Sequence, residues 1–292
     1  MANLLKIFTF CLLSTHFLFA QSDSTQKKWR NVALWTAGGY ATGMTGLSVL
    51  WYSQMKSTSF HWFDDNAEWQ QVDKVGHSFT TFHLSRSAYK IFQNVGVPPQ
   101  KAAILGGITG FMMLSGIEIA DGFMDGYGAS LGDLGANFAG SLLLTSQELL
   151  WKETRFKLKF SFLPTSLAKK RPDVLGNGFV EELIKDYNGQ THWLSVDVYA
   201  FLKKKHPKFP KWLNLAFGYG ASDMLYGKVA YNNIVGYAPY RRFYVGLDFD
   251  LSYIKTKSKF LNTIIFLVDM VRLPAPTLEF SKGQWKGHFL YF

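Results

Sequence analysis

Three short motifs place ionisable side chains inside or beside apolar segments. They are Asp73-Lys74-x-x-His77, Glu118-x-x-Asp121 and Asp133-x-x-x-Asn137. Ionisable groups are costly to remove from water unless each has a partner, so their recurrence in apolar segments predicts one polar site inside a helical bundle. Side chains three or four positions apart share a helix face, which allows each motif to present its groups together.

These residue types support two interpretations of the site. An imidazole with carboxylates suits Zn²⁺, Mn²⁺ or Mg²⁺, and the metal ligands predicted from the sequence are His77, Asp73, Glu118 and Asp121. A metal-bound water could then hydrolyse a phosphoester or an acyl ester. Alternatively, the same residues satisfy one another, together with Asp133 and Asn137, in a buried polar network that fixes the register of the helices.

We identify no complete catalytic motif, and no His-Glu-x-x-His pair is present. The sequence therefore favours a non-enzymatic protein. A metal-dependent hydrolase of a lipid or lipid-linked phosphate remains the alternative, and a divalent metal ion is the only cofactor that the residues suggest.

The first twenty residues predict a signal peptide. Lys6 precedes an apolar run from Ile7 to Leu18, and Ala20 stands before a polar segment. This layout is typical of a secretory leader, with an uncleaved anchor as the alternative. Cys11 is the only cysteine, and the residues before it are not the small ones of a lipoprotein cleavage site. We therefore expect export without lipid anchoring.

Residues 21–152 predict a membrane-associated bundle of about four helices. The segment 31–51 is uncharged and long enough to cross a bilayer. A buried helix of a soluble bundle would have a similar composition and is the alternative. Gly39 and Gly43 would let another helix approach it closely. An amphipathic helix follows over about 72–93. Two further apolar segments lie at 102–120 and 134–147.

Residues 153–292 predict an antiparallel β region of roughly five to seven strands. Alternation of apolar and polar residues marks 156–162, 194–198 and 243–253, and the segments 212–220 and 287–292 are further candidates. An apolar helix is expected over 260–271. The fold class is therefore α+β. The sheet either packs against the helices or lies partly in the membrane, and the strand count is below that of the smallest outer-membrane barrels.

The composition points to lipid as a partner. The chain has a formal net charge of +10 and 17% aromatic residues. A basic exported chain is expected to meet anionic lipid headgroups rather than nucleic acid. Arg86, Lys90 and the basic segment 203–208 are the candidate headgroup contacts.

The three motifs together resemble the YfiM-like family of envelope lipoproteins, a domain of unknown function. They are also distantly similar to VanZ-type membrane proteins. The resemblance covers about residues 70–150, and the segments 191–195, 212–220 and 274–280 look like the long form found in Bacteroidetes-type bacteria. It implies a Gram-negative envelope protein at the outer membrane or a periplasmic membrane face. A role in envelope organisation or lipid homeostasis would fit, and no established activity is implied.

Overall fold

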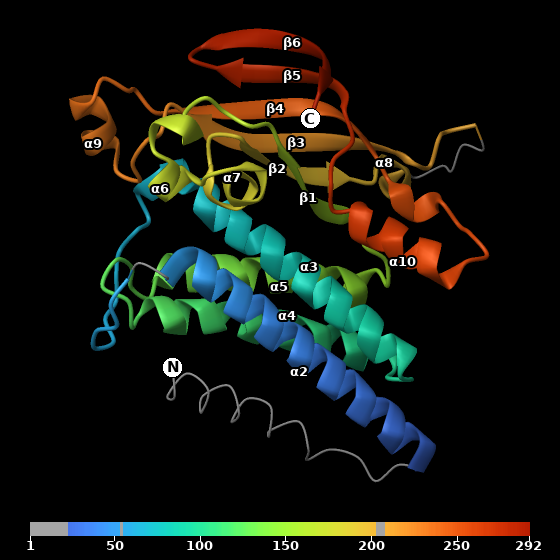
Figure 1. Ribbon diagram of the computed structural model, residues 1–292. Helices are drawn as coiled ribbons and strands as arrows, with labels where there is room; N and C mark the ends of the chain where they lie inside the picture. Colours follow the sequence, from blue (N-terminus) through green and yellow to red (C-terminus); the bar gives the residue numbers. More distant parts are fainter. Residues whose placement is uncertain (1–22, 53–54, 203–207) are drawn as a thin grey trace.

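The structure, a computed structural model, describes residues 23–52, 55–202 and 208–292. The predicted signal peptide and Cys11 lie outside these ranges, as does most of the basic segment 203–208. Within these ranges, four long helices come first and six strands follow (Figure 1). The predicted α+β class is therefore confirmed. The division into domains at residue 152 stays a prediction.

The long helices are α2 (Asp23–Tyr52), α3 (Val72–Asn94), α4 (Pro99–Asp121) and α5 (Leu131–Leu150). Local sequence explains two of their starts. Pro99 occupies the first turn of α4, where its missing N–H is not needed. The Ser130 side chain accepts a hydrogen bond from the backbone N–H of Asp133 and so caps α5.

Glycines let α3 approach its neighbours closely. A Cβ atom at Gly140 of α5 would lie 2.1 Å from the Ser78 carbonyl oxygen, and one at Gly106 of α4 would lie 2.8 Å from the Tyr89 nitrogen. The predicted seam on α2 is different. Within the described residues, a Cβ at Gly39 or Gly43 would meet nothing within 4 Å, so no described helix packs closely on this face of α2 and the expected contact stays a prediction.

Among the described residues, one helix is long and apolar enough to cross a membrane. That helix is α4, and 44% of its most apolar stretch is buried inside the protein. The predicted crossing at residues 31–51 lies within α2, which does not reach this apolar character. A helix at the centre of a bundle has the same composition as a spanning helix, and α4 packs against both α3 and α5.

The six strands form one antiparallel sheet in which each strand pairs with the next along the chain. Their bounds are β1 (Phe156–Phe162), β2 (Gln190–Val196), β3 (Leu213–Ser222), β4 (Tyr240–Phe249), β5 (Ala275–Ser281) and β6 (Gln284–Tyr291). The sequence did not predict β5, because Pro274 and Pro276 indicated a break. Pro276 instead lies at an irregularity in the β5–β6 register, where a strand tolerates proline.

Shorter elements connect the strands. The α-helices are α6 (Pro172–Leu175), α7 (Phe179–Lys185), α8 (Val198–Phe201), α9 (Val229–Ile234) and α10 (Lys259–Val268). The 3₁₀ turns are η2 (Glu68–Gln71), η3 (Ala168–Lys170) and η4 (Leu251–Tyr253). Helix α10 overlaps the apolar helix expected over 260–271; it begins one residue earlier and ends at Val268.

The sheet buries its polar face. Along β4, Tyr244 and Asp248 are buried whereas Phe243 and Leu247 are exposed. Fully buried Lys159 on β1 contacts Asp248 Oδ2 at 2.8 Å. Charged groups are retained inside a protein when they are paired in this way. The alternation was predicted, but the assignment of the polar side to the interior comes from the structure.

Helix α3 packs against the sheet and joins it to the bundle. The Phe79 ring lies 5.7 Å from the rings of Phe160 and His192, and His83 Nε2 donates to the Leu158 carbonyl at 2.7 Å. Arg86 is buried and pairs with Asp269 at 2.9 Å, so it is not available for the predicted headgroup contact. These contacts hold α3 in place, and the first turns of α3 contain residues of the candidate site.

Candidate functional site

The three motifs meet at one end of the bundle. Helices α3 and α5 begin there and α4 ends there, so Asp73 and Asp133 lie in first turns while Glu118 lies in a last turn. The positive end of a helix dipole stabilises a carboxylate in the first turn. Spacing along each helix then brings His77 and Asn137 to the same place.

Lys74 is surrounded by carboxylates. Its ammonium lies 2.7 Å from Asp65 Oδ2, 2.8 Å from Asp133 Oδ1 and 3.4 Å from Asp73 Oδ2. Burial would raise the pKa of Asp65, but hydrogen bonds from Lys74 and Ser130 outweigh it and lower that pKa. Lys74 therefore neutralises part of the negative charge.

The His77 ring is oriented by an amide. Its Nδ1 lies 3.0 Å from Asn137 Oδ1, an oxygen that also accepts from the Thr81 hydroxyl at 3.1 Å. Because an amide oxygen only accepts, Nδ1 is the donor. The other ring nitrogen, Nε2, lies 3.9 Å from Asp73 Oδ1 and 3.8 Å from Asp133 Oδ1.

A neutral imidazole with its proton on Nδ1 would direct a lone pair at these two carboxylates. Electrostatics then favours a second ring proton or a metal ion at Nε2. Burial alone would lower the pKa of His77, but the charges of Asp73, Asp133 and Glu118 outweigh it and raise that pKa. The surrounding carboxylates therefore stabilise a positive charge at His77 Nε2, carried either by a proton or by a metal ion.

Carboxylates outnumber cationic groups in the cluster. Asp65, Asp73, Glu118, Asp121 and Asp133 gather around Lys74 and His77. Burial raises the pKa of Glu118 to about 8, of Asp121 to about 7 and of Asp133 to about 6. Glu118 Oε1 is buried, accepts no hydrogen bond and lies 3.6 Å from His77 Nδ1. The cluster can therefore accommodate further positive charge.

Three residues have the arrangement of a metal site. One donor atom from each of Asp73, His77 and Asp133 lies within 4.8 Å of the others. This set differs from the predicted one. Glu118 lies on the Nδ1 side of the imidazole, and Asp121 Oδ1 accepts from the Tyr52 hydroxyl at 2.5 Å. The set therefore contains Asp133, which was predicted for the polar network. It does not contain Glu118 or Asp121, which were predicted as metal ligands.

Several site residues were not predicted from the sequence. Asp65 precedes α3, and Tyr187, in the strand-rich half of the chain, donates to Asp73 Oδ1 at 2.6 Å. No local pattern identifies Tyr187, because it is 114 residues from its partner. Asp65 lies in an acidic, aromatic segment before α3, outside all three motifs.

Ser130 could have been recognised from the sequence as a candidate site residue. It lies in Gly128-Ala-Ser130-Leu-Gly132, which has the spacing of a serine-hydrolase nucleophile elbow. Its hydroxyl donates to Asp65 Oδ1 at 2.6 Å and accepts from the Asp133 N–H. A nucleophilic serine instead needs a base such as an imidazole beside its hydroxyl. Ser130 therefore caps α5 and holds Asp65 in the cluster.

Comparison with known proteins gives one family. Residues 60–146 match a domain family of unknown function described as a predicted periplasmic lipoprotein (DUF2279). The matched segment contains the whole metal-site arrangement. No curated protein and no solved structure matches the chain.

The family description agrees with the expected export to the cell envelope. It does not distinguish the periplasm from the outer membrane, and the more specific YfiM-like and VanZ-like resemblances stay predictions. The lipoprotein description differs from our expectation at Cys11, a residue outside the described ranges.

Proposed function

We propose that this chain is an envelope protein whose helical bundle binds a divalent metal ion between Asp73, His77 and Asp133. The observation that carries the proposal is the direction of His77 Nε2, which faces two carboxylates while Nδ1 is occupied by Asn137. One imidazole with two carboxylates suits Mn²⁺ or Zn²⁺.

The surroundings of the three residues support this role. Asn137 orients the imidazole as groups around a metal centre commonly do, and the Tyr187 hydroxyl donates to the Asp73 carboxylate. A divalent ion together with the Lys74 ammonium would supply three positive charges to a cluster of five carboxyl groups. The ion would also tie α3 to α5 at the end of the bundle.

Metal content of the purified full chain tests the proposal. Elemental mass spectrometry is expected to find a near-stoichiometric divalent metal in wild type, and little in Asp133→Asn or His77→Gln. Asp173→Asn is the control, since it removes the same charge at a side chain that is 73% exposed. A folded wild-type protein that takes up no metal after supplementation would contradict the proposal and favour the buried polar network.

A second candidate function is metal-dependent hydrolysis of a lipid-linked phosphate. The Asp73 and His77 side chains are 20% and 17% exposed, whereas Asp133 is buried, so the site is open to solvent only on the side of Asp73 and His77. A bound ion would supply Lewis acidity and an activated water. Phosphate release from a lipid phosphate by the metal-loaded protein, abolished in Asp133→Asn, would support this activity. Metal binding without turnover would indicate a structural ion.

For its place in the cell, we propose the outer membrane of a Gram-negative envelope, with a role in envelope organisation or lipid homeostasis. The family description supports the envelope. The net charge of +10 suits contact with an anionic membrane surface, and the choice of the outer membrane follows from the sequence resemblance. Separation of inner and outer membranes by density, followed by immunodetection, tests this location. Recovery in the soluble periplasmic fraction would contradict it.

A further inference from the structure

Helix α10 lies at the side of the molecule (Figure 1). None of its residues is buried. Its inner side is marked by Phe266, whose ring lies 4.2 Å from the Arg86 guanidinium, and by Asp269, which follows the helix and pairs with Arg86. The helix is thus held at one side only.

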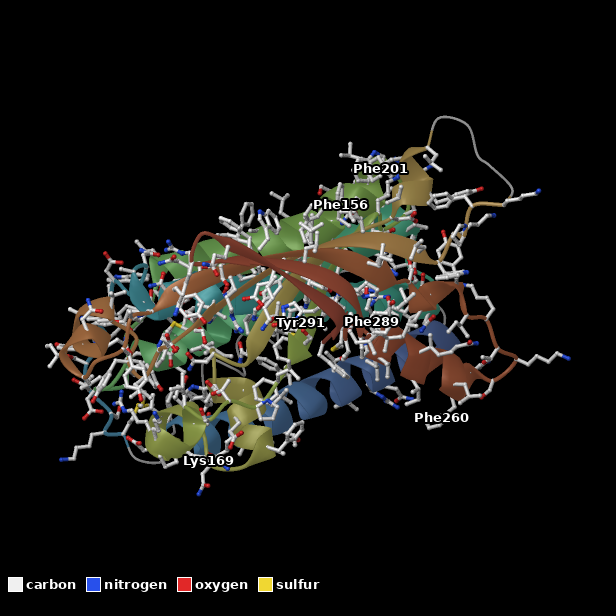
Figure 2. All side chains as sticks on the ribbon, turned by 90° about the horizontal axis from the view of Figure 1, so that it is seen from above. Phe156, Lys169, Phe201, Phe260, Phe289 and Tyr291 are labelled. Atoms are coloured by element: carbon white, nitrogen blue, oxygen red, sulfur yellow. The ribbon has the colours of Figure 1, made fainter. Side chains whose placement is uncertain are left out.

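The outward side of α10 is apolar. The residues on this side are exposed to solvent by the following fractions: Phe260 71%, Leu261 49%, Ile264 40%, Leu267 43% and Val268 42%. These positions are spaced as one stripe of a helix, and the stripe points away from Phe266 and Asp269. Figure 2 shows Phe260 at the outer margin of the protein. A helix that met only water would carry polar residues there.

Lysines precede this stripe. Lys255, Lys257 and Lys259 are all exposed, and none forms an ion pair within the described part of the chain. Lysine is depleted at protein–protein interfaces, whereas it is enriched beside the apolar face of helices that lie on membranes. This charge favours an anionic lipid surface over a protein partner.

We propose that α10 docks on an anionic bilayer. The apolar stripe enters the boundary between headgroups and acyl chains, and the three lysines contact anionic headgroups. The buried Arg86–Asp269 pair links the end of α10 to α3, so the bundle is held at the membrane surface. This inference is independent of the metal site, because the residues proposed to contact lipid lie on α10 or just before it.

A local fluorescent probe tests the docking. In a full chain with Cys11→Ser, a polarity-sensitive dye is attached at Ile264→Cys, or at Leu267→Cys as a second labelled site. The matched control is Ile234→Cys on α9, an apolar side chain that is 79% exposed. Each labelled protein is mixed with phosphatidylcholine vesicles with and without phosphatidylglycerol, after circular dichroism has confirmed folding.

Vesicles containing phosphatidylglycerol are expected to shift the α10 probes to shorter wavelength, and to leave the α9 probe unchanged. Replacing the three lysines by glutamine is expected to weaken this binding by about 100-fold. An unchanged spectrum at both α10 sites would overturn the proposal. So would a shift that depends on protein concentration without vesicles, because it would identify a second copy as the occupant.

Discussion

The imidazole of His77 on α3 and the side-chain amide of Asn137 on α5 are joined at 3.0 Å. Thr81 donates to the same amide oxygen, so the orientation of the ring follows from three residues on two helices. This contact directs Nε2 toward Asp73 and Asp133. Asn137 is therefore a positioning residue for the candidate metal ligands.

Lys74→Met should destabilise the metal-free protein by about 3 kcal/mol, because carboxylates in the cluster would lose their cationic partner. Added Mn²⁺ should recover much of this loss, since an ion at the site replaces the missing charge. Chemical denaturation with and without the metal measures both effects. Lys282→Met, at a lysine that is 59% exposed, is the control. Equal destabilisation with and without metal would contradict metal binding here.

Gly140→Ala should destabilise the bundle by about 3 kcal/mol, since its Cβ would lie 2.1 Å from the Ser78 carbonyl oxygen and force α5 away from α3. Gly135 of α5 provides a matched control because a Cβ there meets nothing within 4 Å. Gly135→Ala should stabilise the helix by up to about 1 kcal/mol. Thermal unfolding followed by circular dichroism compares the two. Equal effects would show that the helices are not in close contact.

His83 should make the protein acid-sensitive. Burial, with smaller effects of nearby charges, lowers the pKa of His83 to about 3 in the folded state. The unfolded chain binds a proton near pH 6.5, so stability falls as the pH drops from about 6.5 towards 3. His83→Gln keeps a donor for the Leu158 carbonyl and should remove up to about 4 kcal/mol of this loss.

Urea unfolding of wild type and His83→Gln at several pH values checks the prediction. The stability difference between the two proteins should be constant above about pH 7.5, where His83 is neutral in both states. It should then change steadily at lower pH. Parallel curves over the whole range would show that His83 titrates normally.

Lys159→Met should cost about 3–5 kcal/mol, because it leaves the buried Asp248 carboxylate without its ion-pair partner. Asp248→Asn in the same protein should recover part of the loss. The Lys159–Asp248 coupling is then obtained from a double-mutant cycle in urea. Strictly additive effects would mean that the two side chains do not interact.

Local structure was largely predictable from the sequence. The motif helices and most strands follow from spacing, capping and alternation, which depend on residues close together in the chain. β5 was missed because Pro276 argues against a strand unless the register is irregular at that point. The membrane crossing expected in α2 followed from the length and lack of charge of segment 31–51, and among the described helices the more apolar α4 is the one that meets the requirement.

By itself, the sequence determined the types of the main elements and brought each polar motif onto one helix face. Only the tertiary structure decided the partners: Tyr187 for Asp73, Asp133 beside His77, and Lys159 for Asp248. It also decided that the polar side of the sheet is the buried one. The physical reason is that an ionisable side chain is stabilised by groups near it in space, and helix packing and strand register bring those groups from distant parts of the chain.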